Sequence, residues 1–547
     1  MIVPGSSNPL LLASGAGYQI ANSLRFRASN SAYLSWTTGS AASDRKYATV
    51  SIWLKRGALT GRNAIYAVNP AGTSGASNQI TMLFDNAGSN GDNITYNNGS
   101  VNRTTTSVYR DPSAHLHFHQ VFDTTQATAA DRVKTAINGV ILTDINIGQD
   151  FSLNANTPFG QASVTEYIGR RDSGLYFDGL VAEIIILVGQ ALPASSFGQT
   201  DAATGVWVPK KFSGTFGSLD RYYKFADASA ATAAAIGKDS SGNGLNATPS
   251  GISVTSGVTF DQMTDTPTNN YAILTPLIPL PSSVLRNANM EFNANTTGAH
   301  RSAASSITLP TSGKWYWEVT ACCNSGGSGS NEMIGVADIS INPQLPASGT
   351  EIGKRTGSDY GYRSDGNKWS NNAGAAYGST YTANDVIGIA WDSDSGTIAF
   401  YKNNVAQGTA YSSITQVAGK FAPASSNAES SGWDIYNFGQ RPFAHTPPTG
   451  FKSLSTANIA STAVTTSGSF TGNAAADGPF VWTNGNPATL TINGNAVTFG
   501  THADKTAGGF KLRSSSSSYN ASGSNTWSAT AGKRFVQSKK PNNAQTN

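Results

Sequence analysis

The stretch DVIGIAWDSDSGTIAFYKNN, residues 385–404, decides the fold of its part of the chain. Apolar residues over 386–391 predict one strand, and residues 394–396 (Asp-Ser-Gly) predict a turn. Apolar residues over 398–401 predict the strand that returns. The stretch therefore predicts an antiparallel hairpin of a β-sandwich.

The composition of the whole chain also favours strands over helices. Only 12% of the 547 residues are charged and 57 are glycine, whereas amphipathic helices need many Lys and Glu residues. A chain of this length exceeds one core, so we expect three or four domains of an all-β fold class. The net charge of +4 is dispersed, which predicts no nucleic-acid partner.

Neither the N-terminus nor the cysteines indicate a secreted, disulfide-rich protein. No basic leader precedes the short run Leu10–Leu12, so we predict no signal peptide and no membrane insertion. Cys322 and Cys323 are adjacent and cannot form a disulfide framework. On a strand they would face opposite sides, which favours small buried side chains over metal ligands.

Pro-rich and Ser/Thr/Ala-rich stretches divide the chain into five segments. The predicted segments are an N-terminal arm as a candidate docking segment (1–20), a first β-sandwich (21–225), a linker and extended segment (226–284), a second β-sandwich (285–454) and a small Gly/Ser-rich β-domain (455–547). Asn493-Gly494 predicts a hairpin turn in the last of these.

Five pieces of the second region follow one another as in SPRY domains. They are KWYWEV (314–319), MIGVA (333–337), GYRSDGNKW (361–369), the hairpin stretch 385–404 and YNFGQRPF (436–443). The region resembles that family, and the resemblance implies a recognition module that binds protein partners through loops at one end of a sandwich.

Six pieces of the first region resemble a concanavalin-A-like, laminin-G-type jelly roll. They are SLRF (23–26), ATVSIWLKR (48–56), HFHQVFDTT (117–125), VKTAINGV (133–140), YIGRR (167–171) and FDGLVAEIIIL (177–187). Asn138-Gly139 predicts a hairpin turn, and Phe177-Asp178-Gly179 a turn that launches the last strand. The resemblance implies glycan or protein binding, sometimes with calcium, but no calcium motif is present and we predict no cofactor.

The order of these regions resembles structural proteins of tailed bacteriophages. That resemblance implies a virion protein, made in the host cytoplasm, of tail-fibre or receptor-binding type. It would be an adhesin for a host-surface glycan or protein, and a homo-oligomer, with a trimer favoured. A structural decoration or adaptor that binds other virion proteins, and a polysaccharide depolymerase, are the alternatives.

Carboxylate motifs for catalysis are absent from the sequence. Hydrolases of the concanavalin-like fold use the spacing E-x-D-x-x-E, and none of the seven Glu residues has Asp two positions later. Asp392 and Asp394 flank a predicted turn, where Asp is favoured by backbone hydrogen bonds. We therefore predict no enzymatic activity, although Asp residues from several strands could still assemble a site that no local motif reveals.

Two groups of residues are candidate ligand sites. His115, His117 and His119 alternate along a predicted strand, so they would share one face as a metal site or as part of the structural core, and the core is favoured.

Tyr360, Tyr362, Asp365 and Trp369 fall in a Gly/Asn/Asp-rich segment and are our predicted binding residues, because flat rings stack on sugars and anchor interfaces. The alternative is that Tyr362 and Trp369 complete the second core.

Overall fold

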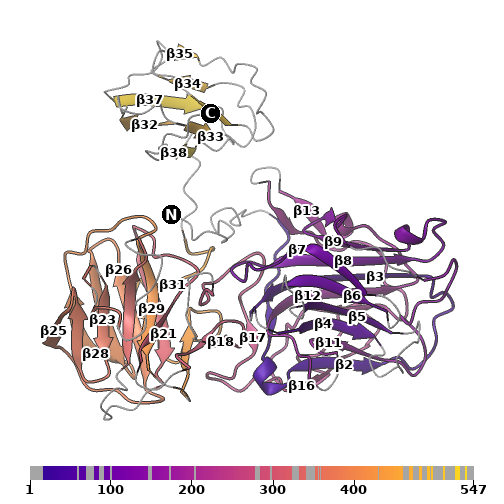
Figure 1. Cartoon of the computed structure of the whole chain (residues 1–547), viewed down its shortest axis with the longest axis horizontal. Coiled ribbons are helices and arrows are strands. Elements are labelled where there is room, and N and C mark those ends of the chain that lie inside the picture. Colours follow the sequence, from indigo (N-terminus) through magenta and orange to yellow (C-terminus); the bar gives the residue numbers. More distant parts are fainter. Residues whose placement is uncertain are drawn as a thin grey trace. The chain divides into compact units, whose positions relative to one another are not determined.

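The computed structural model is all-β, as the composition predicts. It describes residues 17–459, except 58, 60, 69–78, 86–91, 99–101, 146–150, 172–173, 202–204, 277–283, 296–298, 323–331, 341–350, 355, 358, 429 and 431, together with seven strands beyond residue 459. The only helical elements in this part of the chain are the 3-10 turns η2 (Ala28–Asn30), η3 (Ala129–Asp131) and η4 (Ala194–Ser196) (Figure 1). None of its helices is long and apolar enough to cross a membrane.

The first sandwich has an eight-stranded and a seven-stranded sheet. The first sheet runs in the order β10 (Val140–Ile141), β9 (Val133–Ile137), β8 (Leu116–Asp123), β3 (Tyr47–Arg56), β12 (Gly179–Val188), β1 (Ser23–Phe26) and β17 (Gln262–Met263), and β15 (Arg221–Tyr223) pairs with β12. The second runs in the order β16 (Thr248–Ser250), β2 (Tyr33–Thr37), β11 (Thr165–Ile168), β4 (Asn63–Val68), β5 (Ile80–Asp85), β6 (Asn93–Asn97) and β7 (Asn102–Val108). A separate pair consists of β13 (Gly198–Thr200) and β14 (Trp207–Pro209).

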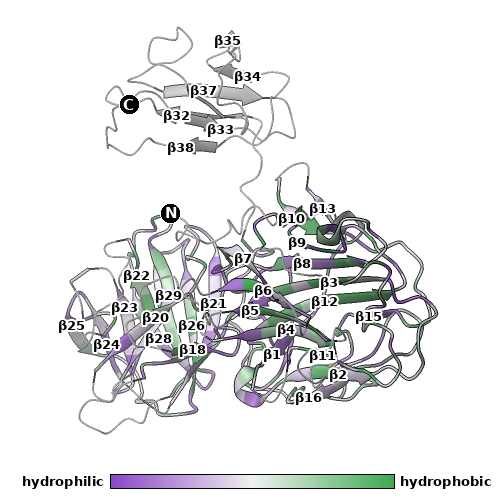
Figure 2. Ribbon diagram, turned by 45° about the vertical axis from the view of Figure 1, so that its right-hand side comes forward, coloured by the Kyte–Doolittle hydropathy of each residue, from purple (hydrophilic) through white to green (hydrophobic). Residues whose placement is uncertain are grey.

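The core of this sandwich lies between the two sheets. Apolar residues at every second position of β3 face inward, and Ile52 stands opposite Phe118 of β8 and Ile184 of β12. Hydrophobic residues concentrate on the central strands β3 and β12 (Figure 2). The predicted Asn138-Gly139 hairpin is confirmed, because β9 and β10 pair across it and both residues have positive φ angles of 50° and 78°.

Much of the segment that the sequence predicts as a linker packs onto the first sandwich. Within 226–276, β16 pairs with β2 and β17 pairs with β1. Asp261 also forms buried ion pairs with Arg25 and Arg27, each at 2.9 Å. This stretch therefore completes both sheets, whereas the domain boundaries drawn from the sequence stay predictions.

The second sandwich has an eight-stranded and a six-stranded sheet. The first runs in the order β18 (Val284–Arg286), β19 (Glu291–Asn293), β30 (Asp434–Asn437), β21 (Lys314–Thr320), β26 (Val386–Asp392), β27 (Thr397–Lys402) and β28 (Val405–Tyr411), and β31 (Lys452–Ser453) pairs in parallel with β21. The second runs in the order β20 (Arg301–Ala304), β29 (Phe421–Asn427), β22 (Met333–Asp338), β23 (Tyr360–Arg363), β24 (Asn367–Ser370) and β25 (Ala373–Ala376).

The hairpin predicted over 385–404 is confirmed as β26 and β27. Trp391 stands opposite Ile398, and Gly396 supplies the left-handed φ of 64° that the turn requires. Trp391 also pairs with Trp315 of β21, and both side chains are buried in the core of the second sandwich. Aromatic rings of this size each bury a large apolar area.

The C-terminal unit is described only through its strands. One sheet has the order β32 (Ser467–Thr471), β37 (Ser524–Ala529), β34 (Leu490–Ile492) and β35 (Asn495–Ala496). The other has the order β36 (Gly509–Lys511), β33 (Phe480–Trp482) and β38 (Val536–Ser538). The predicted Asn493-Gly494 turn and most of the predicted N-terminal arm, residues 1–16, lie outside the described residues.

Candidate functional site

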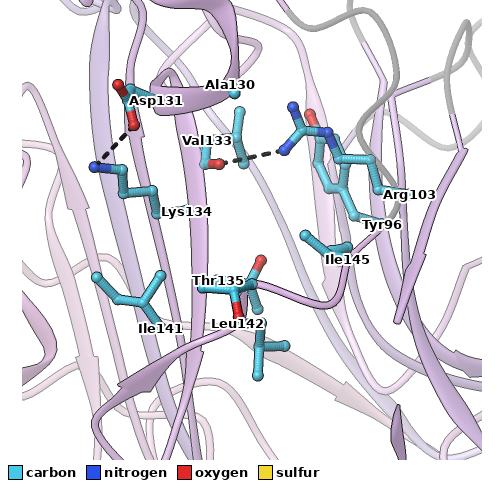
Figure 3. Close-up of a pocket in the computed structure, with 11 residues that line it drawn as sticks. Tyr96, Arg103, Ala130, Asp131, Val133, Lys134, Thr135, Ile141, Leu142 and Ile145 are labelled. Carbon is cyan, nitrogen blue, oxygen red and sulfur yellow. Dashed lines mark hydrogen bonds and ion pairs between the residues drawn. The ribbon is translucent and has the colours of Figure 1, made fainter. Parts of the chain in front are cut away.

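A pocket of about 350 Å³ opens at one edge of the first sandwich. It lies where β9 and β10 of one sheet approach β6 and β7 of the other, and residues from these strands and from the adjoining turns line it (Figure 3). Its volume is within the range of small-molecule sites in proteins. The edge position arises because both sheets end here.

The lining of this pocket combines apolar walls with a few polar groups. Ile141 and Leu142 form part of the apolar surface, and the Ile141 side chain is 53% exposed. Asp131 and Lys134 form an ion pair at 3.2 Å, and both side chains are more than 40% exposed (Figure 3). Such a lining can contact the apolar face of a ligand and donate or accept hydrogen bonds at the same time.

Arg103 brings a cation into the depth of the pocket. Arg103 is 3% exposed, and its Nη1 donates to the carbonyl oxygen of Val133 at 3.4 Å. Burial lowers the pKa of Arg103, and the neighbouring phenol of Tyr96 acts in the opposite direction. A buried guanidinium that lines a pocket is a natural donor to ligand oxygens.

The aromatic residues predicted as a binding group lie on different faces of the six-stranded sheet. Tyr360 and Tyr362 of β23 face the core, and Tyr362 is fully buried among Tyr381, Phe400 and other rings. Its hydroxyl donates to the carbonyl oxygen of Ser379. Tyr362 therefore completes the core of the second sandwich, which was the alternative to a binding role. Its ring is not accessible to a partner in this structure.

Trp369 lies on the opposite face, because β24 pairs with β23 and Trp369 stands across from Gly361. The ammonium of Lys354 is 4.7 Å from the centre of the Trp369 ring. Asp365 occupies the turn between the two strands and accepts from Arg363 Nη1 (2.9 Å) and the backbone N–H of Asn367 (3.0 Å).

Burial tends to raise the pKa of Asp365, but these donors outweigh it and lower the pKa. The structure therefore does not bring the four predicted residues together, and a binding role for Tyr360, Asp365 and Trp369 stays a prediction.

The three histidines of the first sandwich have different neighbours. His117 and His119 lie on one face of β8, and His115 immediately precedes this strand. His117 stacks on Trp53 at 4.7 Å between ring centres, and its Nε2 is hydrogen-bonded to Ser51 Oγ at 2.8 Å. His119 Nε2 contacts the carbonyl oxygen of Leu192 at 3.0 Å. His115 Nδ1 lies 3.8 Å from Asp265.

Burial lowers the pKa of all three imidazoles, so they are neutral around pH 7. Within the described residues their nitrogens do not form a group with metal-ligand spacing.

One group with such spacing was missed by the sequence reasoning. Ligand atoms of Cys322, Glu332 and Asp434 all lie within 4.8 Å of one another. The three residues come from separate parts of the second sandwich, and the adjacency of Cys322 and Cys323 pointed away from a ligand role. Only the pairing of distant strands brings them together.

Comparison with known families identifies part of the second sandwich. Residues 314–435 match the SPRY domain model, so the chain contains a SPRY domain, as its sequence predicts. No curated protein sequence matches the chain.

Several solved structures resemble parts of the chain. The SPRY domain of human HERC1 is 21% identical, with 30% of this chain and 95% of that one covered at a TM-score of 0.24. A putative carbohydrate-binding protein from Bacteroides ovatus is 17% identical, with 42% and 58% covered at a TM-score of 0.30. A pentraxin from Limulus polyphemus is 14% identical, with 32% and 80% covered at a TM-score of 0.24.

Proposed function

We propose that this chain is a non-catalytic recognition protein of a tailed-bacteriophage virion, of tail-fibre or receptor-binding type, and that the pocket of its first sandwich binds a glycan of the host surface. The observation that carries the proposal is the pocket itself, with its apolar wall and its polar groups. The SPRY domain supports a recognition role for the second sandwich, with a protein as the partner class.

A glycan suits this pocket for physical reasons. Sugar rings present apolar C–H faces and many hydroxyls. Leu142 and Ile141 of the pocket can pack against the C–H faces. Lys134, Asp131 and Arg103 can donate to or accept from the hydroxyls. A volume of about 350 Å³ accommodates one or two sugar units of a longer chain that continues into solvent.

The same lining argues for binding rather than cleavage. Glycoside hydrolysis normally requires two carboxyl groups on either side of the scissile bond. Among the residues that line the pocket, Asp131 supplies the single carboxylate, and it is paired with Lys134. Binding without hydrolysis is therefore the proposed activity, and release of reducing ends from host polysaccharide would contradict it.

Two adjacent residues of β10 allow a matched test. Val140 and Ile141 are both apolar and exposed, at 68% and 53%, but only Ile141 lines the pocket. We expect Ile141→Asp to weaken adsorption of the purified chain to host cells about tenfold or more, because a charge would enter the apolar wall. Val140→Asp should leave adsorption unchanged.

The assay measures binding of labelled chain to a panel of bacteria and its ability to block adsorption of the phage. Equal binding by the two variants would refute the pocket as the receptor site. A chain that binds no cells but is present in purified particles would favour the structural alternative. Light scattering that gave only monomer at micromolar concentration would contradict the proposed trimeric fibre.

A further inference from the structure

One end of the second sandwich holds a cluster of possible metal ligands, in which Glu332 and Asp434 are buried and Cys322 is partly exposed. Cys322 follows β21 closely, Glu332 immediately precedes β22, and Asp434 begins β30. Both carboxylates belong to residues that are 0% exposed. Cys322 lies close to the residues that precede β30. A Cβ placed on Gly432 would be only 2.8 Å from the Cys322 carbonyl oxygen.

The Asp434 carboxylate is only half satisfied by the protein. Its Oδ2 accepts from Ser425 Oγ at 2.7 Å and from Asn427 Nδ2 at 3.0 Å. Its Oδ1 is buried and has no hydrogen-bond partner within the described part of the chain. A buried carboxylate that meets only neutral donors is costly, since burial strongly disfavours an uncompensated charge.

Tyr436 independently points to a ligand at this place. It follows Asp434 by two positions on β30, so the two side chains share a face, and it is 0% exposed. Its hydroxyl has no hydrogen-bond partner among the described residues, while that of Ser425 donates to Asp434. Two buried polar atoms on this face of β30, Asp434 Oδ1 and the Tyr436 hydroxyl, thus lack a hydrogen-bond partner in the described part of the chain.

We propose that Cys322 Sγ, a carboxylate oxygen of Glu332 and a carboxylate oxygen of Asp434 bind one Zn²⁺ ion. A thiolate disfavours Ca²⁺ and Mg²⁺, which prefer oxygen ligands, whereas Zn²⁺ accepts sulfur and oxygen together. Bonds of about 2.0–2.3 Å place tetrahedral ligands roughly 3.3–3.8 Å apart. Three donor atoms within 4.8 Å of one another therefore need only a small contraction.

The ion would have two physical effects. Its double positive charge offsets two of the three negative charges of the carboxylates and of the thiolate, which loses its proton on binding. It also links the two sheets, because Asp434 lies in β30 and Cys322 follows β21, both strands of the eight-stranded sheet, whereas Glu332 immediately precedes β22 of the six-stranded one. A water molecule would complete the tetrahedral coordination. This site is independent of the pocket in the first sandwich.

The test is a Zn²⁺ titration of the full-length chain after dialysis against a chelator. We expect one Zn²⁺ per chain by calorimetry, a higher melting temperature, and, with Co²⁺ in place of Zn²⁺, a near-ultraviolet thiolate-to-metal absorption band. Cys322→Ser should abolish that band and weaken Zn²⁺ binding at least about tenfold, and Asp434→Asn should weaken binding to a similar extent.

Cys323→Ser is the matched control because it removes a thiol one position away. It should leave the Co²⁺ band and the Zn²⁺ affinity unchanged. Circular dichroism of each metal-free variant checks that it is folded. Absence of Zn²⁺ binding by the folded parent chain, full affinity in Asp434→Asn, or loss of the Co²⁺ band in Cys323→Ser instead of Cys322→Ser would each overturn the proposal.

Discussion

The buried pair of Lys55 and Asp265 provides the strongest stability prediction. Their side chains are 1% and 0% exposed, and Lys55 Nζ lies 2.9 Å from Asp265 Oδ2. The same ammonium donates to the Asn270 side chain at 2.8 Å and to the Tyr271 carbonyl oxygen at 3.0 Å. Burial lowers the pKa of Lys55 and raises that of Asp265, and each charge opposes the shift of the other.

Breaking this pair from one side should cost about 3–5 kcal/mol of unfolding free energy, which is the usual penalty for an uncompensated buried charge. Lys55→Met keeps the aliphatic stem but leaves the buried Asp265 carboxylate without its cation, while its Oδ1 still accepts from the backbone N–H of Tyr271 at 3.2 Å. Adding Asp265→Asn removes the second charge. The loss of unfolding free energy in the double variant should therefore be smaller, by about 2 kcal/mol or more, than the sum of the losses in the two single variants.

The assay is guanidinium denaturation followed by tryptophan fluorescence, with all four members of the mutant cycle measured together. Lys134→Met is the control, because its pair with Asp131 is exposed and should contribute less than about 1 kcal/mol. Strictly additive effects, or a loss below about 1 kcal/mol in Lys55→Met, would refute the reasoning.

The consequence extends beyond the first sandwich, since the 265–271 segment also contacts the chain that follows the second one. The backbone N–H of Asn270 donates to Thr456 Oγ1 at 2.9 Å, and that of Ala272 donates to the carbonyl oxygen of Leu454 at 3.1 Å. Lys55→Met should therefore also increase protease cleavage within residues 265–272.

Three further changes test the two cores. Burial lowers the pKa of His119 from 6.5 to about 4, so the unfolded chain binds a proton at a higher pH than the folded chain does. The free energy of unfolding should therefore fall as the pH drops from 6.5 to about 4. His119→Phe should remove about 3 kcal/mol of this pH-dependent fall, measured by denaturation at several pH values. Gly335→Ala places a Cβ 2.0 Å from the Tyr360 carbonyl oxygen and should cost about 1–3 kcal/mol, whereas Gly39→Ala, with nothing within 4 Å, should cost far less. Tyr362→Phe removes one buried hydrogen bond and should cost about 1 kcal/mol without changing adsorption to cells; reduced adsorption by the folded variant would contradict its core role.

The amino-acid sequence by itself determined the class of the fold and its local reversals. Low charge and abundant glycine predicted an all-β chain, and alternating apolar residues around Asn138-Gly139 and around residues 394–396 predicted hairpins that the structure contains. These features depend on neighbours a few positions apart, so a pattern with a period of two residues is sufficient to reveal them. The order of motifs over 314–435 likewise identified the SPRY domain.

Only the tertiary structure decided which side chains meet. Strand pairing placed Trp369 across from Gly361, on the face opposite Tyr362, although all three fall within nine residues. It also brought Cys322 to Asp434, more than a hundred positions later, and created the pocket where two sheet edges meet. Register and sheet order depend on packing across the whole sandwich, and no local pattern carries that information.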